Sequence, residues 1–239
     1  MTNDYKKKYS EISDFQYDYD VPKNEDGVVA IGGDLSNKNL IAAYSIGIFP
    51  WYNDHEDILW WSPNPRCILI PSDFHIPKRL SRDIRKTVIH ISFNTTFKQI
   101  IANCAAPRMH QEGTWLNEDM INAYNDLHTM GWSHSVEVWT ENTLIGGLYG
   151  VAIDRVFFAE SMYSRTSNAS KFALLALCHV LKKHHFALID CQVPSAHLFT
   201  LGAKTIKKIN FLEVLKNNCS IKNKFIHWPT GKTNLNDFI

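Results

Sequence analysis

Long hydrophobic runs are absent from this sequence of 239 residues, since no stretch approaches the roughly 18 apolar residues that a membrane span needs. The lysines at positions 6–8 are followed by no apolar stretch of the kind that a secretory signal contains. The remaining composition, 45% apolar and 21% charged, is ordinary for a soluble globular protein. We therefore expect a cytoplasmic protein that contacts no membrane.

Paired cysteines and metal-ligand spacings are also missing. The five cysteines are scattered without a Cys-x-x-Cys motif, and the eleven histidines show no convincing ligand spacing. We expect reduced thiols, no disulfide framework and no metal. A formal net charge of +1 is low for a protein that holds nucleic acid over a large area, so any contact with RNA must be a local patch.

A complete phosphate-binding loop is not present either. Gly32 and Gly33 precede a predicted helix over residues 37–46, but the further glycines and the Lys-Ser/Thr pair of a P-loop are lacking. A simple turn after the short apolar run at 28–31 is the favoured interpretation, and a phosphate cradle is the alternative.

Residues 186–194 carry the most informative chemistry. Four apolar residues predict a short buried strand, followed by Asp190, Gln192 and then a proline that stops it. Because alternate residues of a strand share a face, Asp190 and Gln192 should point one way and Cys191 the other. A carboxylate beside a carboxamide at the mouth of a buried strand is suited to handling an amine and an acyl group. The alternative is a capping aspartate and a solvated glutamine.

Aromatic and basic residues gather in the first third of the chain. Five large aromatics lie among prolines between positions 49 and 61, where they could stack unpaired bases or pack a domain junction. Residues 78–86 predict a helix with a basic face, backed by Leu80 and Ile84. This face is either simply solvated or a phosphate contact.

From residue 88 the pattern predicts a larger α+β unit. A strand at 88–91, helices at 95–104 and 117–130, three strands at hairpin spacing over 135–139, 144–153 and 156–160, and a helix over 169–184 precede the strand at 186–189. A meander, a helix and a further strand with polar residues at neighbouring strand ends are typical of a compact acyltransferase-like core.

Eight short motifs follow one another along the chain. They are AIGGDLS (30–36), GIFPWY (47–52), LWWSP (59–63), GTW (113–115), HSVEVW (134–139), GGLYG (146–150), ESMYS (160–164) and IDCQ (189–192). Together, over about residues 28–211, they resemble those of the leucyl/phenylalanyl-tRNA-protein transferase family.

The resemblance implies a small N-terminal α/β domain over residues 1–66 and a larger N-acetyltransferase-like (GNAT) domain with a mixed sheet over 67–239. It implies an aminoacyltransferase without a cofactor, which moves Leu or Phe from aminoacyl-tRNA to the α-amine of proteins beginning with Arg or Lys. Such transfer marks those proteins for degradation by the N-end rule. Met is a third candidate side chain, and the preference among the three stays open.

The resemblance also assigns residues. Asp190 and Gln192 would be catalytic, and Glu160 would be important for activity. The aminoacyl side chain would lie in an apolar pocket formed by Leu148, Phe157, Met162, Leu174, Leu177 and Ile189. The terminal adenosine would be held by the aromatic residues Tyr44, Trp51 and Trp115. The acceptor stem would meet the basic helix through Lys78, Arg79, Arg82, Arg85 and Lys86.

A mechanism follows from these roles as a hypothesis. The aminoacyl ester is already activated, so no ATP is needed and positioning is the main task. Asp190 would polarise Gln192, whose amide oxygen accepts a hydrogen bond from the attacking amine while backbone donors support the oxyanion. Glu160 would pair with the acceptor's Arg or Lys side chain, or orient its amine.

Three other interpretations compete. An acetyl-CoA-dependent N-acetyltransferase would need a glycine-containing pyrophosphate loop before its long helix, and residues 164–170 contain no glycine. A non-catalytic RNA-binding module leaves Glu160, Asp190 and Gln192 without a purpose. A thiol enzyme using Cys191 and His197 is disfavoured because Cys191 should face away from Asp190 and Gln192.

Overall fold

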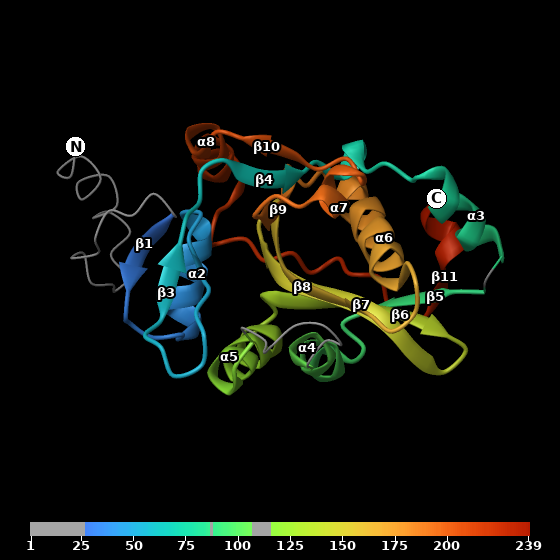
Figure 1. The fold of residues 1–239 in the computed structure, drawn as a ribbon, viewed down its shortest axis with the longest axis horizontal. Helices are drawn as coiled ribbons and strands as arrows, with labels where there is room; N and C mark the ends of the chain where they lie inside the picture. Colours follow the sequence, from blue (N-terminus) through green and yellow to red (C-terminus); the bar gives the residue numbers. More distant parts are fainter. Residues whose placement is uncertain (1–26, 87, 107–115) are drawn as a thin grey trace.

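The computed structural model describes residues 27–86, 88–106 and 116–239, which form two β-sheets with helices packed around them (Figure 1). The smaller sheet is antiparallel, in the order β1 (Val28–Ile31), β3 (Leu59–Trp61), β2 (Phe49–Pro50). Helix α2 (Asn37–Ser45) connects β1 to β2, and the Ser36 side chain caps it by accepting from the Asn39 N–H. The short apolar run at 28–31 forms strand β1, and the helix predicted over residues 37–46 ends one residue early.

The larger sheet contains the remaining described strands. In sheet order they are β10 (Lys204–Ile206), β4 (Arg66–Leu69), β9 (Leu188–Gln192), β8 (Val156–Ser164), β7 (Thr143–Ile153), β6 (Ser133–Thr140), β5 (His90–Phe93) and β11 (Thr233–Asn234). The β8–β9 pair is parallel, and the other neighbours are antiparallel. The predicted α+β class with a mixed sheet is therefore confirmed.

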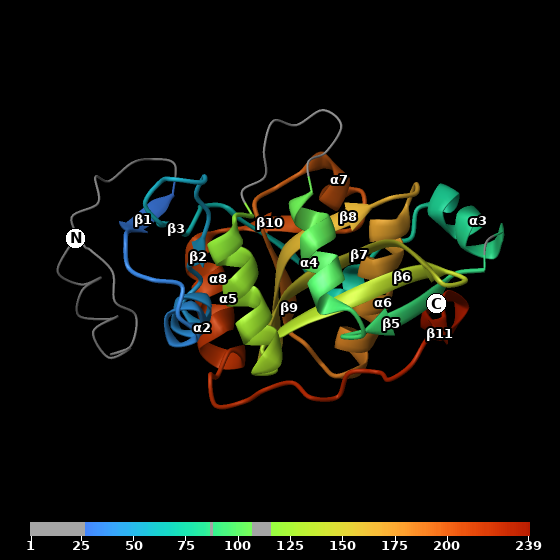
Figure 2. The same cartoon turned by 90° about the horizontal axis from the view of Figure 1, so that it is seen from below.

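Helices cover both faces of the larger sheet (Figures 1 and 2). On one face lie α4 (Phe97–Ala105) and α5 (Glu118–Thr129), and on the other lies the long helix α6 (Ala169–Lys183). Two hydrophobic core clusters result. The first joins the α4–α5 face to α2 and to α8 (Lys208–Asn218), and the second joins α6 to α3 (Lys78–Lys86) and the C-terminal 3-10 turn (Leu235–Phe238).

The helix ends follow the local sequence. Asn117 caps α5 by accepting from the Met120 N–H, with Glu118 and Asp119 in the first turn, as its sequence predicts. In α3, Leu80 and Ile84 are buried, so the predicted apolar stripe is confirmed. Within the described ranges, no helix combines the length and the apolar character needed to cross a membrane.

The structure differs from the sequence prediction at several strands of the larger sheet. The strand predicted at 88–91 begins at His90, where pairing with β6 starts. The strand expected to end before Asp190 continues through Gln192, because it pairs with β4 on its other side. Strand β4 itself was not predicted, since it is buried along its whole length and lacks the alternation that marks a half-exposed strand.

Candidate active site

The site is built where the parallel strands β8 and β9 separate. Their pairing ends at Phe158 and Asp190, after which β8 stays with β7 and β9 stays with β4. Each of these outer pairings has a register shift, which leaves Glu160 as an extra residue in β8 and Cys191 as an extra residue in β9. Bulges of this kind bend a strand and redirect its side chains. Glu160 and Gln192 consequently meet across the gap.

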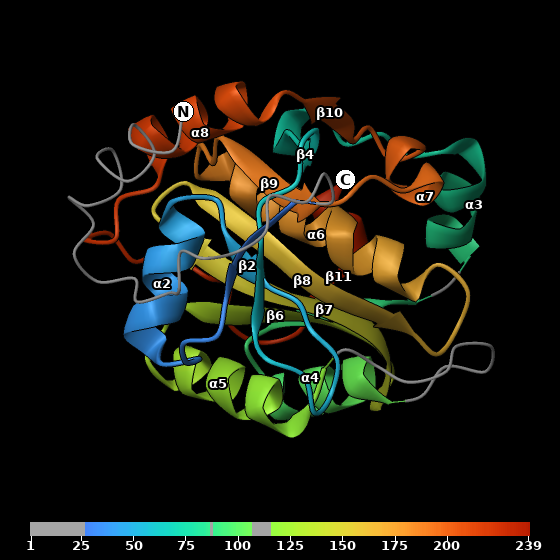
Figure 3. The ribbon, with the colours of Figure 1, turned by 60° about the vertical axis from the view of Figure 1, so that its left-hand side comes forward.

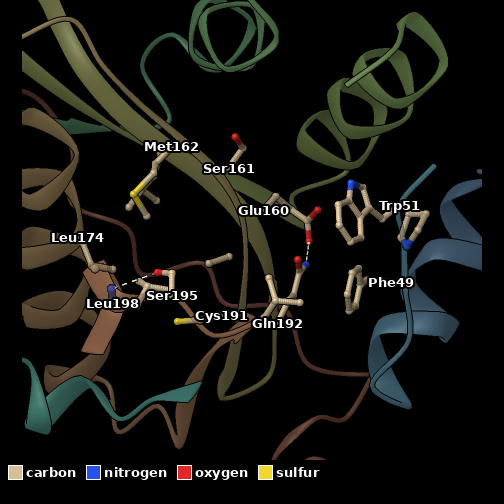
Figure 4. A pocket seen from close by; sticks show the side chains of 14 residues that line it. Phe49, Trp51, Glu160, Ser161, Met162, Leu174, Cys191, Gln192, Ser195 and Leu198 are labelled. Carbon is tan, nitrogen blue, oxygen red and sulfur yellow. Dashed lines mark hydrogen bonds between the residues drawn. The ribbon is translucent and has the colours of Figure 1, made fainter. Parts of the chain in front are cut away.

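A cavity of about 390 Å³ opens between the separated strands (Figure 4). Glu160 and Gln192 form one polar wall, and α7 (Ala196–Phe199) contributes Leu198. The segment around β2 closes another side, with Phe49, Pro50 and Trp51 lining the cavity. Figure 3 shows this segment running in front of β8 and β9. The smaller sheet therefore completes a site whose reactive groups belong to the larger one.

Asp190 is fully buried and is held by an arginine. Arg66, 1% exposed, donates from Nε to Oδ1 at 2.8 Å and from a terminal nitrogen to Oδ2 at 2.6 Å. The guanidinium carbon lies 4.8 Å and 4.7 Å from the ring centroids of Phe49 and Phe211. Such a fork with aromatic faces around it fixes both partners in one geometry.

Asp190 contacts the backbone of Gln192 rather than its side chain. The Gln192 N–H donates to Asp190 Oδ1 at 2.9 Å, and Gln192 itself has φ 62°, in the left-handed region that a non-glycine residue adopts only when held. The Asp190 side chain accepts from Arg66 and the Gln192 side chain donates to Glu160, whereas Cys191 packs against the second core cluster. Asp190 was predicted to polarise the Gln192 carboxamide. In the structure it instead accepts a hydrogen bond from the Gln192 backbone N–H.

Glu160 is the centre of the polar wall. Its Oε1 accepts from the Tyr44 hydroxyl at 2.7 Å and from Gln192 Nε2 at 2.9 Å, and its Oε2 accepts from the Tyr124 hydroxyl at 2.9 Å. Burial raises the pKa of Glu160 to about 7, although the hydrogen bonds from Tyr44 and Tyr124 act in the opposite direction. Both protonation states of this carboxyl are therefore accessible near neutral pH.

The predicted apolar pocket divides into two layers. Leu148, Met162 and Leu174 line the cavity directly. Phe157, Leu177 and Ile189 are fully buried in the second core cluster and do not line it. The second group can thus act on a bound side chain only by supporting the first.

The aromatic residues predicted to hold adenosine lie in different environments. Trp51 is 42% exposed, lines the cavity and has its ring 5.3 Å from that of Trp61. Tyr44 is completely buried against Phe158, so no ring face is open for stacking, and its hydroxyl is used by Glu160. Trp115 lies outside the described residues.

The predicted basic helix is α3, at the end of the molecule remote from β1 (Figures 1 and 2). Its cationic side chains are exposed: Lys78, Arg79, Arg82, Arg85 and Lys86. Asp83 accepts from Asn168, which precedes α6, so the basic helix is tied to the helix that supplies Leu174.

Sequence reasoning missed Arg66 and Tyr124. Arg66 stands alone at the start of an apolar run, and a single charge there is a usable signal for a buried ion pair. Tyr124 sits on the buried face of an ordinary amphipathic helix, and nothing in its local pattern separates it from core. In the described part of the chain, no group of three His, Cys, Asp or Glu side chains is arranged to hold a metal ion.

An apolar cavity between separated strands, walled by a titratable carboxyl and a carboxamide, defines the class as an α+β enzyme suited to acyl transfer. The family model described as "Leucyl/phenylalanyl-tRNA protein transferase" matches residues 68–216, and the model of that family's N-terminal domain matches residues 33–64. The chain belongs to the leucyl/phenylalanyl-tRNA-protein transferase family.

Relatives that carry this family name cover most of the chain. The protein of Lawsonia intracellularis is 48% identical over 189 residues, which are 79% of this chain and 83% of the relative. That of Nitrosospira multiformis is 50% identical over 190 residues, 80% of this chain and 82% of the relative. That of Hahella chejuensis is 45% identical over 215 residues, 87% of this chain and 91% of the relative.

Proposed function

We propose that this chain transfers Leu or Phe, with Met as a third candidate, from aminoacyl-tRNA to the α-amine of proteins beginning with Arg or Lys. The cavity carries the proposal, because its apolar wall suits an aminoacyl side chain while Glu160 and Gln192 face it with groups that bind an amine. The family membership supplies the substrate class. Marking of the product for N-end rule degradation, in the cytoplasm, belongs to the same proposal.

The chemistry requires little beyond positioning. The aminoacyl ester is activated, and an α-amine has an ordinary pKa near 8, so a neutral nucleophile is readily available. The Gln192 Nε2–H group donates to Glu160 Oε1, which leaves the amide oxygen to accept from the incoming amine. No ATP, metal or cofactor enters the step.

The residue roles follow the contacts. Gln192 and Glu160 are the catalytic residues that touch the acceptor amine. Asp190 acts behind them, because it is buried and holds the Gln192 backbone. Arg66 keeps Asp190 in place.

The aminoacyl side chain is proposed to contact Leu148, Met162 and Leu174, with Phe157, Leu177 and Ile189 packed behind them. A wall of this kind measures size coarsely, since one methylene is worth about 1 to 3 kcal/mol. The wall therefore suits more than one large apolar side chain.

For the tRNA, we propose that the exposed ring of Trp51 holds the terminal adenosine and that α3 meets the acceptor stem. Contact of Trp115 with the adenosine is part of the same proposal. Tyr44 is reassigned from stacking to the polar wall, because its ring is buried.

We further propose that residues 1–66 and 67–239 are separate domains and that the larger one is GNAT-like. The proposed boundary falls between the two matched family segments. Two parallel strands, β8 and β9, are joined by helix α6 and separate after a short pairing, and this arrangement supports the GNAT-like assignment. An acetyl-CoA enzyme is not favoured, because the loop before α6 contains no glycine. A thiol enzyme is not favoured either, since a hydrogen bond with Cys67 and burial raise the pKa of Cys191 and oppose a thiolate.

The test is transfer of labelled leucine from leucyl-tRNA to a peptide beginning with arginine, without ATP or CoA. The matched control is the same peptide acetylated at its N-terminus. We expect label on the free peptide alone. Binding of leucyl-tRNA without transfer would indicate an RNA-binding protein instead.

A further inference from the structure

Glu160, Tyr44 and Tyr124 form a closed ring of oxygen atoms. The two hydroxyls each contact the carboxyl, one at Oε1 and one at Oε2, and they also contact each other at 2.5 Å. The three residues come from three elements, β8, α2 and α5. The ring is thus a tertiary feature that no single stretch of sequence contains.

The number of protons in the ring depends on Glu160. Each hydroxyl holds one proton, so with an ionised carboxylate two protons serve three oxygen–oxygen contacts. If both hydroxyls donate to Glu160, their mutual contact has no hydrogen. A proton on Glu160 Oε2 completes the set, because the carboxyl then donates to Tyr124, Tyr124 to Tyr44, and Tyr44 to Oε1. Protonation therefore adds a hydrogen bond to an arrangement that is already built.

We propose that this ring is the proton acceptor of the reaction, receiving the surplus proton of the acceptor's α-ammonium group, with Tyr44 and Tyr124 as the positioning residues that make Glu160 a base. The inference rests on the proposed function. The ammonium gives one proton to Glu160, and the resulting amine attacks the ester carbonyl. The new C–N bond replaces the C–O bond, the amine's second proton passes to the ribose oxygen, and protonated Glu160 later releases its proton to water.

The surroundings of the ring favour this role. Gln192 on β9 donates to Oε1 in either protonation state. Asp190 on β9 raises the pKa of Glu160 by its negative charge, which is paired with Arg66 on β4. Tyr149 on β7 packs against Tyr124, but its hydroxyl has no hydrogen-bond partner among the described residues. Burial raises the pKa of Tyr44 and of Tyr124 well above the usual value, so both remain donors.

The first test compares wild type with Glu160→Gln in kcat/KM for an arginine peptide from pH 6 to pH 8.5. Glutamine cannot take the proton, so the variant must wait for peptide that is already neutral, which becomes abundant only near pH 8. The ratio of wild type to variant should fall by roughly five- to tenfold over this range. A constant ratio overturns the inference and leaves the proposed function standing, whereas absence of wild-type transfer at every pH overturns the proposed function.

The second test uses the hydroxyls, which Phe removes at nearly constant volume. Tyr44→Phe and Tyr124→Phe each take a donor from ionised Glu160, so the midpoint of the acid limb of kcat/KM should rise by about one pH unit. Tyr149→Phe is the matched control and should leave the midpoint in place. The proposed role of the ring is overturned if the midpoint does not move in Tyr124→Phe. It is also overturned if the midpoint moves equally in Tyr149→Phe.

Discussion

At the residue scale, a buried ion pair holds the backbone of Gln192. Arg66 and Asp190 are both almost without solvent contact, and Asp190 in turn holds the N–H of Gln192. A charge in such a place is tolerable only while its partner remains. Because Gln192 has φ 62°, loss of the hold would allow it to relax to an extended backbone and withdraw its amide from Glu160.

Replacing Arg66 with Met should destabilise the protein strongly, since Asp190 would be left buried and unpaired. Loss of one partner of a buried pair costs about 3 to 5 kcal/mol. Arg66→Lys should cost less, because the ammonium keeps the charge but not the fork. Urea unfolding of the two variants measures both effects.

A double variant separates stability from activity. Arg66→Met with Asp190→Leu replaces the pair by apolar groups, which commonly restores stability. Transfer should nevertheless stay low, because the Gln192 N–H has lost its acceptor. Recovery of transfer together with stability would mean that the pair serves the fold alone.

The residue scale also shows where sequence reasoning stops. Asp190, Gln192 and Glu160 were found, because polar residues at the ends of apolar runs are visible in a linear pattern. Arg66 and Tyr124 were not, since each acquires its meaning from a partner more than 30 positions away. The mode of contact between Asp190 and Gln192 was also missed, because the bulge at Cys191 depends on pairing with β4.

At the element scale, the separation of β8 from β9 determines what the cavity can hold. Met162 lies on β8 and borders the cavity, while Leu177 lies behind it on α6. The two positions differ in access to a bound side chain, although both belong to the predicted pocket.

Met162→Ala should enlarge the cavity and raise transfer of Phe relative to Leu. A change of this size alters the difference in transition-state free energy between Phe and Leu transfer by about 1 to 3 kcal/mol, which appears in the ratio of the two kcat/KM values. Leu177→Ala, the matched control, should lower stability by about 2 to 5 kcal/mol without moving that ratio. If the Phe-to-Leu ratio changed in Leu177→Ala but not in Met162→Ala, the aminoacyl side chain would not contact Met162.

For helix α3 we propose a separate role, which is contact with the acceptor stem of the tRNA. Arg82→Ala with Arg85→Ala should weaken aminoacyl-tRNA binding and reduce the slope of log affinity against log salt by about 1 for each lost phosphate contact. Lys216→Ala, on the exposed side of α8, controls for loss of one surface charge. Salt titrations of tRNA affinity measure the slopes, and identical slopes in all proteins would exclude α3 from the interface.

Element prediction succeeded where periodicity was strong. Helices α2, α3, α5 and α6 were predicted from their apolar stripes and caps, and the β6–β8 meander from apolar runs separated by turn residues, although β7 is buried on both faces. Strands β4, β10 and β11 escaped prediction, since each is short and exists through pairing with a distant strand. The mixed sheet was predicted as a class, but its order required the structure.

At the scale of the whole molecule, Glu160 links the site to global stability. A folded-state pKa of about 7 exceeds that of an unfolded glutamate, so between about pH 4.5 and 7 the native state binds more protons than the unfolded state. Stability contributed by this group is therefore greatest at low pH and is lost as pH rises toward 7.

Glu160→Gln should remove that part of the pH dependence. The unfolding free energy of wild type minus that of the variant should decline from pH 4.5 to pH 7 and then level off. His134, whose pKa burial lowers to about 3, acts in the opposite direction, but it is present in both proteins and cancels in the difference. A difference that is flat with pH would show that Glu160 titrates normally.

We propose that the Glu160–Gln192 wall positions the acceptor amine against the aminoacyl ester. The most direct test is the single-turnover rate of leucine transfer by Gln192→Ala at saturating leucyl-tRNA, measured beside its affinity for leucyl-tRNA. We expect the rate to fall at least 100-fold, about 2.7 kcal/mol, with the affinity nearly unchanged. Equal losses of rate and affinity would contradict this role, because Gln192 would then bind the tRNA rather than serve the attacking amine.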